Sequence, residues 1–83
     1  MTVRFNKILV ANRGEIAVRI VRTLRKMGIE SHALFSESDR NSLHVKTADF
    51  SHFSGEGIEA YLDIDRIIRI ANSFVIVGIF DKF

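Results

Sequence analysis

The polar turn Asn12-Arg13-Gly14-Glu15 lies between a short apolar run and a helical pattern, a position where functional residues are often found. In open α/β folds, a strand-to-helix turn of this kind presents backbone N–H groups to phosphates. A dinucleotide fingerprint requires three glycines, and only Gly14 is present here. Glu15 would stabilise the helix dipole but repel an anion. The turn therefore argues against a nucleotide site, and we expect Gly14 only to let the helix start close against the strand.

A row of basic side chains is the second candidate, since Arg19, Arg22 and Lys26 share one side of the predicted helix at i, i+3 and i+7. Such a row could contact phosphates or an acidic partner subunit, although a solvated face is the commoner outcome. No aromatic residue interleaves with it, which argues against nucleic acid. The formal net charge of +2 is also too small to indicate nucleic acid.

The remaining polar residues give weaker signals. His32, His44 and His52 lack the spacing of a metal site, and we expect them to be structural. The loop Glu37-Ser38-Asp39-Arg40 could bind a ligand, but polar loops are by default surface. The chain has no Cys, which excludes disulfides and Cys-based metal sites. We therefore identify no catalytic, cofactor-binding or metal-ligating residue from residue types alone.

Strand and helix patterns alternate along the chain. Apolar runs predict four strands, over Lys7–Ala11, Ser31–Phe35, Phe50–Phe53 and Phe74–Phe80. Helical spacing predicts two principal helices, over Ile16–Met27 and Asp63–Ala71, and one or two helical turns over Leu43–Ala48. Gly28 would end the first principal helix, and Asp63 would cap the second. This alternation predicts an α/β fold with a parallel sheet and right-handed crossovers.

The 83 residues make one domain with a marginal core. The longest uncharged stretch, residues 70–80, is far shorter than the roughly 20 residues that span a bilayer. The first residues do not read as a signal peptide, so we expect a cytoplasmic location, or the mitochondrial matrix in a eukaryote. Parallel sheets need cover on both faces, and two principal helices cannot cover four strands. We therefore expect the sheet to be incomplete.

The segment Lys7–Ile20, with the sequence KILVANRGEIAVRI, resembles the opening of the biotin carboxylase family. The similarity extends over about residues 5–71 and takes in Met27–Ile29, Phe35–Arg40, Leu43–Val45, Ala48–Asp49 and Tyr61–Ile64. Family members are subunits or domains of acetyl-CoA, propionyl-CoA, methylcrotonyl-CoA, pyruvate and urea carboxylases. The resemblance implies that residues 1–83 form part of a Rossmann-like, pre-ATP-grasp domain. Residues 72–83 keep an apolar run but depart from the family pattern.

The resemblance also implies a parent reaction, in which biotin is carboxylated with ATP, Mg²⁺ and bicarbonate. The family residues that hold these groups lie almost wholly downstream, and none has a counterpart here. We therefore expect the chain alone to bind no ATP, Mg²⁺, biotin or bicarbonate, and to be non-catalytic. Asn12-Arg13-Gly14-Glu15 is then a family motif without an assigned catalytic role.

The first helix contributes to dimers in bacterial-type family members, and Arg19 and Arg22 match basic positions there. Lys26 stands where an acidic residue often sits, which counts against reciprocal ion pairing. The expected partners are thus a second copy of the chain or a carboxylase subunit. One alternative is a non-catalytic interaction module that docks onto a full-length carboxylase subunit through the first helix. A stand-alone nucleotide-binding domain is a weaker alternative, because Gly14 is the only glycine of the turn.

Overall fold

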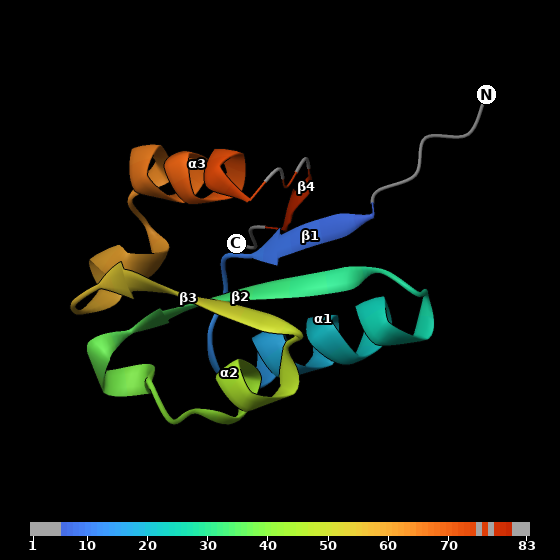
Figure 1. Ribbon diagram of the computed structural model, residues 1–83. Coiled ribbons are helices and arrows are strands. Elements are labelled where there is room, and N and C mark those ends of the chain that lie inside the picture. The colour runs from blue at the N-terminus through green and yellow to red at the C-terminus, as the bar shows by residue number, and fades with distance from the viewer. Residues whose placement is uncertain (1–5, 75, 77, 81–83) are drawn as a thin grey trace.

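Four parallel strands form one sheet in the computed structural model, which describes residues 6–74, 76 and 78–80. The strands are β1 (Lys7–Val10), β2 (Glu30–Ser36), β3 (Phe50–Gly55) and β4 (Gly78–Phe80). Their order is β3-β2-β1-β4, so β1 and β2 are central (Figure 1). The predicted α/β class with about four parallel strands is confirmed.

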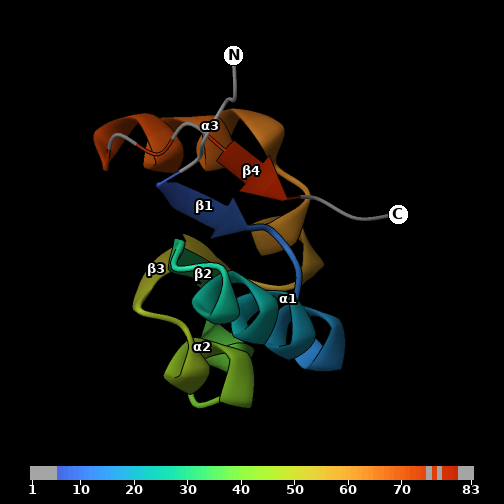
Figure 2. The same cartoon turned by 90° about the vertical axis from the view of Figure 1, so that its right-hand side faces the viewer.

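Helices lie on both faces of the sheet (Figure 2). On one face are α1 (Gly14–Lys26) and the short α2 (Leu43–Thr47). On the other are α3 (Ile64–Ser73) and the 3₁₀ turn η2 (Ile58–Tyr61), while a second such turn, η1 (Glu37–Asp39), follows β2. The two principal helices therefore lie on opposite faces, and the shorter turns supply additional cover.

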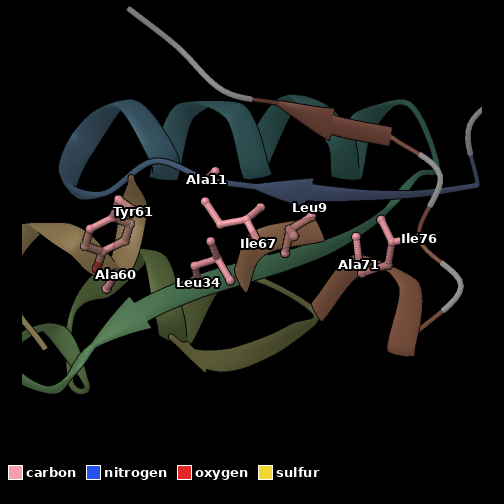
Figure 3. Close-up of a cluster of buried hydrophobic side chains, with 8 residues drawn as sticks. All are labelled: Leu9, Ala11, Leu34, Ala60, Tyr61, Ile67, Ala71 and Ile76. Carbon is pink, nitrogen blue, oxygen red and sulfur yellow. The ribbon is translucent and has the colours of Figure 1, made fainter. Parts of the chain in front are cut away.

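The core is divided by the sheet into two apolar clusters, because successive side chains of a strand point to opposite faces. Leu9 of β1 packs with Leu34, Ile67 and Ala71 on the α3 face (Figure 3). Val10, the next residue, packs against α1 on the other face. Both β1 residues are completely buried. The continuous apolar run of β1 thus fits a strand that is covered on both sides.

Asp63 caps α3 as predicted, since its side chain accepts a hydrogen bond from the Arg66 N–H at 3.1 Å. The other end of α3 differs from the prediction. Phe74 was expected to begin a strand, but its N–H donates to the Ala71 carbonyl and it terminates the helix. The Ile76 N–H also donates to Ala71, at 2.8 Å, so the helix is closed before the strand begins at Gly78. The predicted strand positions 75 and 77 lie outside the described residues.

Candidate functional site at the carboxyl edge of the sheet

The turn Asn12-Arg13-Gly14-Glu15 leaves the carboxyl end of β1 and enters α1. Gly14 has φ +67°, in the left-handed region, while Arg13 before it is extended. A Cβ added at Gly14 would meet no atom within 4 Å. The expected reason for this glycine, close approach of helix and strand, is therefore wrong. Gly14 is needed for its backbone conformation, which costs other L-residues about 1–2 kcal/mol.

Arg13 projects from this turn toward Asp39, which lies in η1 after the neighbouring strand β2. The guanidinium donates to both carboxylate oxygens, from Nε to Oδ2 at 2.7 Å and from Nη2 to Oδ1 at 2.9 Å. The Asp39 side chain is only 8% exposed, whereas that of Arg13 is 59% exposed. Carboxyl ends of neighbouring parallel strands meet at one sheet edge, and this fork joins the two turns there.

Tyr61 of η2 completes the cluster from the opposite side. Its hydroxyl donates to Asp39 Oδ2 at 2.6 Å and accepts the Ser36 N–H at 3.2 Å. The hydroxyl therefore connects η2 to the end of β2 and to η1. Arg13, Asp39 and Tyr61, which we call the carboxyl-edge cluster, bring together three chain segments that lie far apart in sequence.

The contacts within the cluster set its charge states. Hydrogen bonding from Arg13, followed by that from Tyr61, holds the pKa of the Asp39 carboxyl well below its usual range. The bond to Asp39 raises the pKa of Arg13. Burial, and then the bond to Asp39, raises the pKa of Tyr61. At neutral pH the cluster is consequently an ion pair with a neutral phenol beside it.

A second arginine–carboxylate pair lies nearby and offers a contrast. Arg40 donates to both oxygens of Glu37, at 2.8 and 3.2 Å. Both side chains are more than half exposed, and the Arg40 guanidinium also lies over the rings of Phe35 and Phe53. The loop expected to lie at the surface thus divides in two, because Glu37 and Arg40 are solvated whereas Asp39 is buried.

A small cavity of about 160 Å³ opens beside the cluster, lined by Arg13, Ser36, Ser38, Asp39, Gly57, Ile58 and Tyr61. Pockets for drug-sized ligands are about 300–1,000 Å³, so this cavity is too small for a nucleotide. Asp39 is unsuited to act as a general base because both of its oxygens already accept hydrogen bonds from charged or phenolic donors. The positive charge of Arg13 against both oxygens also disfavours Mg²⁺ at Asp39. This geometry suits a structural role, in which Asp39 holds together the chain segments that carry Arg13 and Tyr61.

The basic residues of α1 lie away from this cluster. Arg19 and Arg22 are exposed and line a cavity of about 520 Å³ between α1 and α2, whose other walls include Val18 and His44. Neither arginine forms an ion pair with the residues that the structure describes. Arg25, in contrast, donates to the Thr47 carbonyl and ties α1 to the end of α2. Lys26 is also exposed.

The three histidines do not converge on one site. His44 is buried, and its Nε2 lies 2.9 Å from the Leu34 carbonyl, which fits the structural role predicted for it. His32 and His52 lie side by side on β2 and β3, with Nδ1 and Nε2 2.8 Å apart. Within the described residues, no group of three or more His, Asp or Glu side chains is arranged to hold a metal ion.

Sequence reasoning missed the carboxyl-edge cluster. Arg13 belonged to a singled-out turn and Asp39 to a loop, but nothing in the sequence linked them, and Tyr61 received no role. The available signal was positional, because Arg13 and Asp39 each follow a predicted strand. Two parallel neighbours would bring such residues to one edge of the sheet.

The comparisons with known proteins identify the class of protein. Residues 4–80 match the family described as biotin carboxylase, N-terminal domain. The chain belongs to this family, and the resemblance of its opening segment to biotin carboxylases is confirmed.

Among curated relatives, the α subunit of rat mitochondrial methylcrotonoyl-CoA carboxylase is 51% identical over 69 residues, which cover 81% of this chain and 10% of the relative. The biotin carboxylase of Halalkalibacterium halodurans is also 51% identical over 69 residues and is covered to 15%. The chain therefore spans only a small fraction of the curated relatives it matches.

Solved structures agree with the fold. The biotin carboxylase domain dimer of Hydrogenobacter thermophilus 2-oxoglutarate carboxylase, a complex with MgADP, ADP and bicarbonate, is 35% identical with a TM-score of 0.94. The match covers 99% of this chain and 18% of that one. The urea carboxylase of Kluyveromyces lactis is 47% identical with a TM-score of 0.90, over 95% and 7% of the two chains.

Proposed function

We propose that this chain is the N-terminal segment of a biotin carboxylase, in which a longer protein carboxylates biotin with ATP, Mg²⁺ and bicarbonate. The observation that carries the proposal is the family match over residues 4–80 combined with coverage of only 10–15% of the curated relatives. On this view the segment supplies a folded support and the ligands are held elsewhere in the longer protein. We expect that protein in the cytoplasm, or in the mitochondrial matrix of a eukaryote.

The chain by itself is proposed to be non-catalytic. The cavity beside the carboxyl-edge cluster is too small for ATP, and both oxygens of Asp39 already accept hydrogen bonds from Arg13 or Tyr61. Glu15 stands in the first turn of α1, where its charge disfavours a bound phosphate. No step of phosphoryl transfer is therefore assigned to residues of this chain.

The direct test is an assay of the purified chain for ATP cleavage that depends on biotin and bicarbonate. We expect no turnover above that of a blank without protein. A full-length biotin carboxylase in the same assay is the positive control. Turnover that copurifies with the 83-residue chain would contradict the non-catalytic assignment.

We further propose that α1 is the surface through which the chain meets a carboxylase subunit or a second copy of itself. An apolar groove of about 500 Å³ runs between α1 and β4, lined by Ile16, Arg19, Ile20, Thr23, Leu24, Met27 and Phe80. Met27 is 65% exposed and Phe80 is 44% exposed. Apolar side chains beside exposed Arg19 suit a partner that has apolar anchors and carboxylates.

Co-purification from cells that contain a full-length carboxylase tests this surface. The double variant Arg19→Glu, Arg22→Glu should lose the carboxylase, because both side chains are exposed and their reversal repels carboxylates. The matched control is Lys46→Glu combined with Arg69→Glu, which makes the same charge change at exposed positions of α2 and α3. Equal recovery of the carboxylase by both double variants would exclude α1 as the docking surface.

A further inference from the structure

A chain of polar groups crosses the sheet near its amino edge, far from the carboxyl-edge cluster. Glu30 Oε2 lies 2.6 Å from His32 Nε2, and His32 Nδ1 lies 2.8 Å from His52 Nε2. The two imidazole rings are almost parallel, 3° apart, with centroids separated by 5.1 Å. His32 is buried, with 4% of its side chain exposed. Such a chain has strict requirements for where its protons lie.

Aromatic rings enclose the two histidines. His32 stacks on Phe50 at 4.9 Å, and the Phe74 ring, at the end of α3, lies 4.2 Å from the His52 ring. Since α3 runs antiparallel to the strands, its end reaches the amino edge of the sheet (Figure 1). The histidines therefore join β2, β3 and the end of α3 at one place.

The hydrogen bonds define the proton positions in the neutral form. Because Glu30 can only accept, His32 Nε2 carries a proton and its Nδ1 must accept from His52 Nε2–H. One added proton can be accommodated at His52 Nδ1. The His52 Nε2 proton then passes to His32 Nδ1, and the positive charge rests on His32 beside the Glu30 carboxylate. All hydrogen bonds persist, with the direction of the central one reversed.

A second proton cannot be accommodated in the same way. Both rings would then be imidazolium ions with only donors, facing each other across 2.8 Å. We propose that His32 and His52 form a pair that holds one added proton. A second proton breaks the hydrogen bond between the two rings, releases Phe74 and makes the contact of β2, β3 and the end of α3 acid-sensitive. Burial, followed by repulsion from His32, lowers the pKa of His52, in the direction that such a pair requires.

The other charged groups near the pair have hydrogen-bond or ion-pair partners of their own. Lys7 of β1 donates to the Phe74 carbonyl at 3.5 Å and adds a further positive charge. Asp49, before β3, accepts from the Ser31 N–H at 2.9 Å. From α3, Arg66 pairs with Asp63 at 3.6 Å and donates to the Ser54 carbonyl, at the other end of β3. Glu30 is thus the carboxylate in contact with the pair.

Histidine side-chain ¹⁵N NMR of the full chain, from pH 8 to pH 5, tests the proposal without any substitution. At pH 8 we expect both rings neutral with the proton on Nε2. On acidification His32 should become imidazolium while His52 changes to its Nδ1–H form. The proposal is overturned if both rings become imidazolium over the same pH range while the chain stays folded.

Unfolding by urea at several pH values gives a second readout. Below about pH 6.5 the unfolded chain protonates both histidines while the folded pair holds one proton, so stability falls as the pH falls. This difference of one bound proton lowers the equilibrium constant for folding about tenfold for each unit by which the pH falls. His52→Gln, whose amide can donate or accept toward His32, should remove that contribution. An unchanged pH dependence in folded His52→Gln would contradict the proposal.

Two further variants distinguish the effect of the His32–His52 pair from the general effect of losing a histidine. His44→Gln is the matched control, because His44 lies beside Tyr61 and bonds the Leu34 carbonyl. It should leave the tautomer change of His52 intact. Glu30→Gln removes the counter-charge, so uptake of the first proton should move to lower pH. Uptake of that proton at an unchanged pH would exclude the assigned role of Glu30.

Discussion

The carboxyl edge of the sheet and its β4 side differ in how completely the chain itself satisfies them. At the carboxyl edge, Asp39 accepts hydrogen bonds from Arg13 and Tyr61, and no oxygen of the buried carboxylate lacks a partner. On the β4 side, Ile79 and Phe80 are more than 40% exposed, and Phe80 borders an apolar groove. The buried Asn12 Oδ1, in the adjoining turn, has no hydrogen-bond partner among the described residues. The cluster of Arg13, Asp39 and Tyr61 is thus satisfied within the chain, whereas the β4 side exposes apolar surface of the kind found at interfaces.

The two regions differ in where their contact partners come from. Polar partners at the carboxyl edge come from residues 13, 39 and 61, all within the present sequence. The apolar groove between α1 and β4 is open among the described residues, and the proposed partner would cover it. Such a division is consistent with the proposal that the chain is one segment of a longer carboxylase.

The largest effect is expected for Arg13→Ala, which leaves the Asp39 carboxylate buried without its counter-ion. We expect a loss of about 2–3 kcal/mol in the free energy of unfolding, less than the 3–5 kcal/mol of fully buried pairs because Arg13 is 59% exposed. Urea denaturation measures this loss. Arg40→Ala, which breaks the solvated pair with Glu37, is the matched control and should change stability far less. Equal losses would refute the distinction between the two pairs.

Tyr61→Phe should have the next largest effect. The substitution removes a hydroxyl that donates to Asp39 and accepts from the Ser36 N–H, while the ring remains. A loss of about 1–3 kcal/mol is expected because a buried donor and a charged acceptor both lose a partner. A double-mutant cycle with Arg13→Ala should give a coupling energy of about 0.5–3 kcal/mol, and strict additivity would show that the three residues do not act together.

Gly14→Ala tests the turn that positions Arg13. Since Gly14 has φ +67° and open space around its Cα, alanine should cost about 1 kcal/mol through backbone conformation alone. Gly14→Asn is the informative control, because asparagine adopts the left-handed region more readily and should lose less stability. If both variants lose the same free energy of unfolding, the positive φ of Gly14 is not the cause of the loss.

The smallest effect on folding is expected at the open side. Phe80→Ser should change the free energy of unfolding by no more than about 0.5 kcal/mol, as at other exposed positions. It should, however, reduce self-association of the isolated chain, because it removes apolar area from the groove beside α1. Analytical ultracentrifugation measures the association. A large loss of stability with unchanged association would mean that Phe80 belongs to the core of this chain.

The sequence predicted the elements better than their polar contacts. The run Lys7–Ala11 correctly predicted a strand buried on both faces, because a continuous apolar run satisfies two covered surfaces at once. The burial of Asp39 could not be predicted in the same way. Its partners Arg13 and Tyr61 are 26 and 22 residues away, and only the parallel pairing of β1 with β2 brings the turns together.

The end of α3 was also predicted incorrectly, for a physical reason that lies in the backbone. Phe74 belongs to an apolar run that continues to Phe80, so its composition favours a strand. The Ala71 carbonyl nevertheless accepts from the N–H groups of both Phe74 and Ile76. These hydrogen bonds close the helix locally and delay the strand to Gly78.

The size of the natural gene product distinguishes a segment of a longer carboxylase from a short protein that acts by itself. An antibody raised against residues 36–46, used on a denaturing gel of source cells, would detect any polypeptide that contains this segment. We expect a band far above 9.5 kDa, because the proposed carboxylase is much longer than this chain. A band at about 9.5 kDa as the sole product would contradict it, and the short chain would then act as a protein in its own right.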